Sequence, residues 1–116
     1  MASIKMQGRL GAVETANRVM EGVLASGVSC ELVDSVVRNL GGISVYIMVF
    51  EKYYMRASNR ASLTVVVTGD AYSSSVDAIG SGGGQGAVFK FSYGAENSFV
   101  STVEQVLTRL GFSIAL

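Results

Sequence analysis

The sequence predicts an α+β fold in which an antiparallel sheet of five or six strands carries two helices on one face. Two stretches, one near each end of the chain, repeat apolar residues with the period of a helix. Between them, runs rich in β-branched and aromatic residues alternate with short turns that contain glycine, asparagine and aspartate. The order strand, helix, meander, helix is satisfied most simply by an antiparallel sheet with both helices on the same side.

A single domain, residues 1–116, accounts for the whole chain, because no linker, internal repeat or charge block divides it. A chain of this length buries roughly two thirds of the surface that its unfolded form exposes. The core therefore needs neither a disulfide nor a metal ion.

The first predicted strand is Ser3–Arg9, where apolar and polar residues alternate until Gly8 and Gly11 interrupt the pattern. From Ala12 the apolar residues recur with helical spacing, and Gly27 fits the left-handed position that follows a helix. The predicted apolar stripe of this helix consists of Val13, Ala16, Val19, Met20, Val23 and Leu24.

The next segment, Val28–Val37, fits two patterns. Its first half alternates as a strand does, whereas its second half, continued to Leu40, also fits a helical stripe. A strand is favoured, with a bulge or bend near Asp34.

A meander of strands follows. The turn Asn39–Gly42 predicts a hairpin, and Ile43–Met55, which is apolar on both faces, is expected to be the central strand. The remaining parts are the reversal Ala57–Arg60, the strand Leu63–Thr68, the turn Gly69–Asp70 and the strand Tyr72–Ile79. The serines of the last strand predict a weak or edge position.

Alternation over Ala87–Tyr93 predicts a last short strand, after which the second helix begins at Gly94. Gly111 followed by Phe112 is typical of a helix end. The apolar stripe of this helix consists of Phe99, Val100, Val103, Val106, Leu107 and Leu110.

Composition excludes several classes of function. The chain has no histidine, which removes Ser-His-Asp and Cys-His catalysis and every zinc site that uses histidine. Nine basic and nine acidic residues balance, which argues against a nucleic-acid or anionic-membrane binder. The single cysteine, Cys30, cannot form an internal disulfide and is expected to be a small buried residue. No signal peptide or membrane span is predicted, so the expected location is cytoplasmic.

The run Gly80–Gly86 holds five glycines in seven positions, which a fold accepts where a side chain would not fit. In an up-and-down sheet this run lies at the same rim as Arg56 and Arg60, and guanidinium groups beside exposed N–H groups can hold a phosphate or carboxylate. Both helices are expected to begin at the opposite rim, so no helix dipole contributes. A plain connection between strands and close packing at a subunit contact are the alternatives. The candidate ligand-binding residues are Arg56, Asn59, Arg60, Ser81, Gly82, Gly83, Gly84 and Gln85.

Three stretches, Glu51–Met55, Asn59–Leu63 and Ala78–Gly86, together with the helix from Gly94, resemble a family of small uncharacterised bacterial proteins classed as a domain of unknown function. The resemblance extends from the first strand to the second helix. It implies a compact α+β fold with no assigned activity, and it directs attention to Asn59, Arg60, Ser81, Gly83 and Gln85.

Two functions follow as hypotheses. The first is a small non-enzymatic cytoplasmic module that self-associates, as a dimer in the simplest case, through the uncovered sheet face or an edge strand. It would bind a small anionic ligand near the glycine run. The second is an enzyme or ligand-processing subunit that orients an anionic substrate with Arg56, Arg60 and the Gly80–Gly86 loop, with Tyr53 or Tyr54 as proton carrier. Neither hypothesis includes a cofactor or a metal ion. An apolar fraction of 49% against 16% charged residues favours a surface that a second copy covers.

Overall fold

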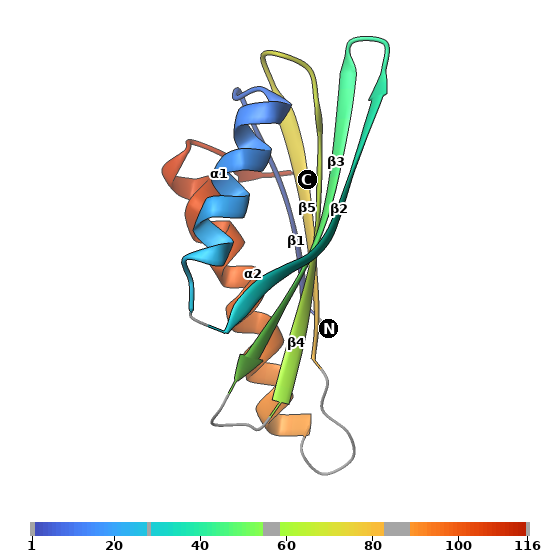
Figure 1. Ribbon diagram of the computed structural model, residues 1–116. Helices are drawn as coiled ribbons and strands as arrows, with labels where there is room; N and C mark the ends of the chain where they lie inside the picture. Colours follow the sequence, from blue (N-terminus) through green and yellow to red (C-terminus); the bar gives the residue numbers. More distant parts are fainter. Residues whose placement is uncertain (1, 28, 55–58, 83–88, 116) are drawn as a thin grey trace.

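The computed structural model describes residues 2–27, 29–54, 59–82 and 89–115, with the backbone alone at 54, 59 and 89–97. The described residues form two layers, a six-stranded antiparallel sheet and two helices on one of its faces (Figure 1). This confirms the predicted α+β fold. In chain order the elements are β1 (Ala2–Gly8), α1 (Ala12–Leu24), β2 (Cys30–Leu40), β3 (Ile43–Tyr54), β4 (Asn59–Gly69), β5 (Ser74–Gly82), α2 (Phe89–Arg109) and β6 (Ser113–Ile114).

The strand order is β2-β3-β4-β5-β1-β6, so the meander is continuous and the first strand joins it beside β5. The expectation that Ile43–Met55 is the central strand is wrong, because β3 lies one place from the β2 edge. The edge position expected for Tyr72–Ile79 is also wrong, because β5 lies between β4 and β1. Ser75 and Ser81 are exposed on the face away from the helices, and Ser74 is buried with hydrogen-bond partners, so serines are accommodated in an interior strand.

From Cys30 onward the ambiguous segment after the first helix is a strand, β2, as favoured, and Val28 lies outside the described residues. Its register against β3 shifts between Leu32 and Asp34, which confirms the bulge expected near Asp34. Leu40 pairs with Ile43, and Gly41 has φ +66°, so the two-residue turn is of the kind that glycine favours in hairpins.

The core lies between the sheet and the helices. In β4 every second residue is fully or almost fully buried, namely Ala61, Leu63, Val65 and Val67, while the residues between them are partly exposed. This alternation fits a sheet whose other face is not covered by any of the described elements. On the helical side, α2 packs over β4, β5 and β1, and α1 lies beside it. Gly22 permits their close approach, because a Cβ at this position would clash with Val106.

The expected strand Ala87–Tyr93 is wrong from Phe89 onward, where α2 begins, and its first two residues lie outside the described part of the chain. β5 has β4 on one side and β1 on the other, which leaves no place beside it for a further strand. The expectation that both helices begin at the same rim depended on that strand and is also wrong. Figure 1 shows α2 starting at the end of the sheet where β4 begins and β5 ends.

The two helices end differently. Gly111 has φ +88° and Phe112 N–H donates to the Leu107 carbonyl at 2.9 Å, which confirms the predicted glycine-ended helix. At α1 the prediction is wrong, because the helix is capped by Ala25 in a right-handed conformation and Gly27 has no positive φ. Val13, expected in the apolar stripe of α1, is 56% exposed, and Thr15 is buried instead.

Candidate functional site

The rim where β4 begins and β5 ends brings together part of the predicted site, and we call it the Arg60 rim. Ser62 pairs with Ser81 and Ala61 with Gly82 in the sheet register, and Arg60 directly precedes Ala61 in β4. The predicted proximity of Arg60, Ser81 and Gly82 is therefore confirmed. The backbone of Asn59 starts β4, opposite Tyr54. Four other predicted site residues lie outside the described residues: Arg56, Gly83, Gly84 and Gln85.

The polar groups of the Arg60 rim are largely engaged with one another. Arg60 Nη1 lies 3.2 Å from Glu51 Oε1, and the hydroxyls of Ser62 and Ser81 are 2.9 Å apart. These residues line a shallow hollow of about 180 Å³. Any anion bound here would compete with the Glu51 carboxylate for the guanidinium group.

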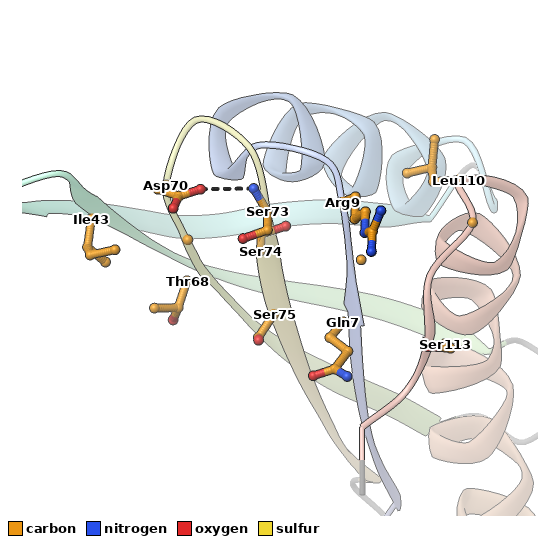
Figure 2. A pocket seen from close by; sticks show the side chains of 13 residues that line it. Gln7, Arg9, Ile43, Thr68, Asp70, Ser73, Ser74, Ser75, Leu110 and Ser113 are labelled. Atoms are coloured by element: carbon orange, nitrogen blue, oxygen red, sulfur yellow. Dashed lines mark hydrogen bonds between the residues drawn. The ribbon is translucent and has the colours of Figure 1, made fainter.

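A larger hollow, of about 570 Å³, lies at the opposite rim, where β4 ends and β5 begins (Figure 2). Its lining is rich in hydroxyl groups, with one amide and one guanidinium, contributed by residues that include Thr68, Ser75, Gln7, Ser113 and Arg9. The register aligns Thr68, Ser75, Gln7 and Ser113 in one row across four strands. Such a lining can hydrogen-bond a polar solute.

The carboxylate of this hollow, Asp70, serves the turn between β4 and β5. Its Oδ1 accepts the N–H groups of Tyr72 at 2.8 Å and Ser73 at 2.9 Å, and the second of these bonds is drawn in Figure 2. These bonds stabilise the ionised form and lower the pKa of Asp70. A carboxylate with a lowered pKa is poorly suited to proton transfer near neutral pH. Its role is to hold the turn that the sequence predicts at Gly69–Asp70.

A third group of polar side chains lies at the end of α1. Lys52 Nζ donates to the Ser26 carbonyl at 3.1 Å, which places a cation at the carboxyl end of the helix. Cys30 is half-buried beside this contact, and burial raises the pKa of its thiol. A raised pKa leaves little thiolate at neutral pH, so the thiol is a packing group. Within the described parts of the chain, no group of three or more acidic or cysteine side chains could hold a metal ion.

The face of the sheet opposite the helices, here called the open face, is apolar near β2. The register places Val36, Ile47 and Val66 in one row across β2, β3 and β4, and all three are half-buried, with no element of the described chain lying over them. Val45 and Val49 flank Ile47 on the same strand, and Ile79 is 45% exposed on β5. Figure 1 shows both helices on the other side of the sheet.

The open face continues to the β2 edge, which we define as Asp34–Leu40. Among the described strands β2 is paired on one side only, with β3. All residues of this edge except the half-buried Val36 are exposed, and Val37 and Leu40 are 45% and 69% exposed. Figure 1 shows the tip of the β2–β3 hairpin standing clear of both helices. A long exposed edge strand is a ready template for pairing with another strand.

Sequence reasoning named an edge strand as a means of association but did not identify its residues. Asp34 and Arg38 were missed, although the alternation Asp34, Val36, Arg38 places one acidic and one basic side chain on the same face, two positions either side of a valine. This alternation indicates a surface for association only once the strand is known to lie at an edge of the sheet.

Neither helix, as far as it is described, is long and apolar enough to cross a membrane. No curated protein and no solved structure matches this chain. A family model, the Family of unknown function (DUF6054), matches residues 1–111. The match agrees with the resemblance found in the sequence and covers nearly the whole described fold, and the chain therefore belongs to the DUF6054 family.

Proposed function

We propose that this protein is a non-enzymatic module of the cytoplasm that works as a homodimer, assembled on the β2 side of its sheet. The observation that carries the proposal is the β2 edge, an exposed strand segment that adjoins an apolar row on the open face. An edge of this kind is a liability unless something covers it, and a second copy of the same chain is always present to do so.

The use of the polar groups supports a non-enzymatic role. Asp70 holds a turn, Lys52 holds the end of α1, and Arg60 is paired with Glu51. Tyr53, which the enzyme hypothesis uses as proton carrier, is 41% exposed on β3. General acid–base catalysis requires a proton carrier that is held in position beside the reacting group.

The test is the mass of the protein in solution, measured by light scattering after gel filtration and by sedimentation equilibrium from low micromolar to near-millimolar concentration. The proposal expects twice the chain mass of 12.2 kDa at the upper end of this range. A mass of one chain throughout would reject it.

A second candidate function, binding of a small anionic ligand, is favoured by one observation. Arg60, Ser62, Ser81 and Gly82 line a common hollow, so a guanidinium and hydroxyl groups converge there. Inorganic phosphate and small carboxylates should then raise the thermal midpoint of the wild type, because a ligand that binds the native form stabilises it.

The Arg60→Ala variant should lose that shift. Arg18→Ala is the matched control, because Arg18 is also exposed and also pairs with a glutamate, Glu14, at 3.1 Å. Equal shifts in wild type and Arg60→Ala would remove this candidate and leave the dimer proposal untouched.

A further inference from the structure

Two hydrogen bonds show which backbone groups of β2 face away from β3. Ser35 N–H donates to Asp34 Oδ1 at 2.8 Å, and Arg38 Nη1 donates to the Val37 carbonyl at 3.2 Å. Both bonds are exposed, and both use side chains of adjacent residues in the strand. Because groups that face β3 are consumed by the β2–β3 ladder, Ser35 and Val37 direct their N–H and C=O groups to the outer side. In the single chain, therefore, Asp34 and Arg38 satisfy outer backbone groups of the edge.

We infer that two copies join edge to edge, with β2 paired antiparallel to β2 of the partner about a two-fold axis at Val36; this rests on the proposed homodimer and specifies its interface. In this register Ser35 stands opposite the partner's Val37. The Ser35 N–H donates to the carbonyl of the partner's Val37, and by symmetry the same bond forms on the other side of the axis. The Ser35 N–H and the Val37 carbonyl, which form hydrogen bonds with side chains in the monomer, therefore form hydrogen bonds with each other across the dimer.

The same register places Asp34 opposite the partner's Arg38. The register with β3 assigns Asp34, Val36 and Arg38 to the open face, since they stand opposite Val49, Ile47 and Val45. These are non-hydrogen-bonded positions of the new pairing, where opposed Cα atoms approach to about 4.5 Å and side chains interact most closely. The carboxylate and guanidinium that are released from the edge backbone thus form two symmetric ion pairs across the axis.

Other registers do not fit these charges. A two-fold axis at Asp34 would place the two Asp34 side chains opposite each other, and an axis at Arg38 would do the same with the two arginines. Like charges directly opposite each other are unfavourable. An axis at Ser35 or Val37 leaves both charged side chains without opposite partners. The bulge between Leu32 and Asp34 stops the pairing from extending further toward the start of β2.

The apolar contacts agree with the register. Val36 meets the partner's Val36 on the axis, so the rows that contain Val36, Ile47 and Val66 in the two copies join into one. A pairing limited to the β2 edge is smaller than a standard protein interface, so we expect a dissociation constant on the order of micromolar.

A cysteine cross-link tests the register. In a Cys30→Ala background, Val36→Cys places two thiols on the axis, within the Cα separation of about 4.4–6.8 Å that a disulfide requires. Val33→Cys is the matched control, because Val33 is 53% exposed on the same strand but lies away from the axis. Mild oxidation should convert Val36→Cys into a covalent dimer and leave Val33→Cys monomeric on a non-reducing gel. Equal cross-linking of the two variants would overturn the register.

Charge reversal provides a second, independent test. Asp34→Arg and Arg38→Asp each oppose like charges twice per dimer and should raise the dissociation constant about ten-fold or more. The double variant D34R/R38D restores opposite charges and should recover most of the affinity. Circular dichroism checks that each exposed substitution leaves the fold intact. A dimer by light scattering that shows neither rescue nor the Val36→Cys cross-link refutes this interface but not the homodimer, whereas a monomeric wild type refutes both.

Discussion

Thr15→Val and Ser74→Ala each remove one hydroxyl from a buried network that fastens α1 to β5. Thr15 and Ser74 are 0% and 5% exposed, and their hydroxyl oxygens are 3.0 Å apart. Both also reach the Leu10 carbonyl oxygen, Ser74 at 2.8 Å and Thr15 at 3.3 Å. The shorter distance assigns the Ser74 proton to Leu10, so the Thr15 proton goes to the Ser74 oxygen.

Either hydroxyl alone can satisfy the Leu10 carbonyl, so each single substitution should cost only one neutral hydrogen bond, about 1 kcal/mol of unfolding free energy. The double variant removes both donors and leaves a partly buried carbonyl without a partner, which adds at least about 1 kcal/mol. We therefore expect the double variant to lose about 3 kcal/mol of unfolding free energy, whereas the losses of the two single variants add up to about 2 kcal/mol.

Urea denaturation followed by circular dichroism measures all four free energies, with unchanged slopes as the check that the unfolded states are comparable. Thr102→Val is the control, because the Thr102 hydroxyl makes an exposed bond to the Ser98 carbonyl within α2, and it should change the stability by less than about 0.5 kcal/mol. If the double variant costs no more than the two single variants together, Leu10 is satisfied elsewhere and the reasoning is refuted.

Three further predictions concern the core, a helix end and a turn. Leu63→Ala, at a fully buried position, should lower the free energy of unfolding, measured by calorimetry, by about 2–5 kcal/mol. Ile79→Ala, on the open face, should lower it by less than about 1 kcal/mol. Similar losses for the two variants would contradict the assignment of the two faces. Gly111→Ala should lower the free energy of unfolding, measured by chemical denaturation, by about 1–2 kcal/mol. The loss comes from backbone strain alone, because φ at Gly111 is +88° and an added Cβ would meet nothing within 4 Å. An unchanged denaturation midpoint would contradict this prediction. Asp70→Asn should destabilise the protein at neutral pH. The pKa of Asp70 is lowered in the folded state, so the stability that its carboxylate contributes is present above the unfolded pKa and is lost as the pH falls through the folded value. Melting curves of wild type and Asp70→Asn should therefore converge in acid, below about pH 4, and a constant gap would argue against the Asp70 turn bonds.

Much of the local structure could be predicted from the sequence because it depends on residues that are close along the chain. The spacing of Ala16, Val19 and Val23 was enough to place α1, and Gly41 to place the β2–β3 hairpin. The bulge near Asp34 was predictable in the same way, since the alternation changes phase there. The burial of Thr15 could not be predicted, because a polar residue on the buried side of this helix is explained only by its partner Ser74, which lies 59 positions away.

The candidate site was predictable in part. The direction of the meander was sufficient to place Arg60 beside Ser81 and Gly82, because consecutive antiparallel strands return to the same rim. The pairing of Arg60 with Glu51 was not foreseen, since it depends on the register between β3 and β4. The start of α2 was misplaced for a related reason: nothing near Phe89 in the sequence indicates that β1 occupies the edge of β5.

The sequence by itself determined the fold class, most of the secondary structure and the exclusion of histidine chemistry, since periodicity, turn residues and composition are properties of the chain alone. Only the tertiary structure decided that β1 pairs with β5, which makes β5 an interior strand and leaves β2 at an edge. Pairing between distant strands is selected by how completely whole faces are buried, and a local pattern does not encode that. The same long-range choice turned Asp34 and Arg38 from ordinary surface charges into the residues that govern how this edge can meet a second copy.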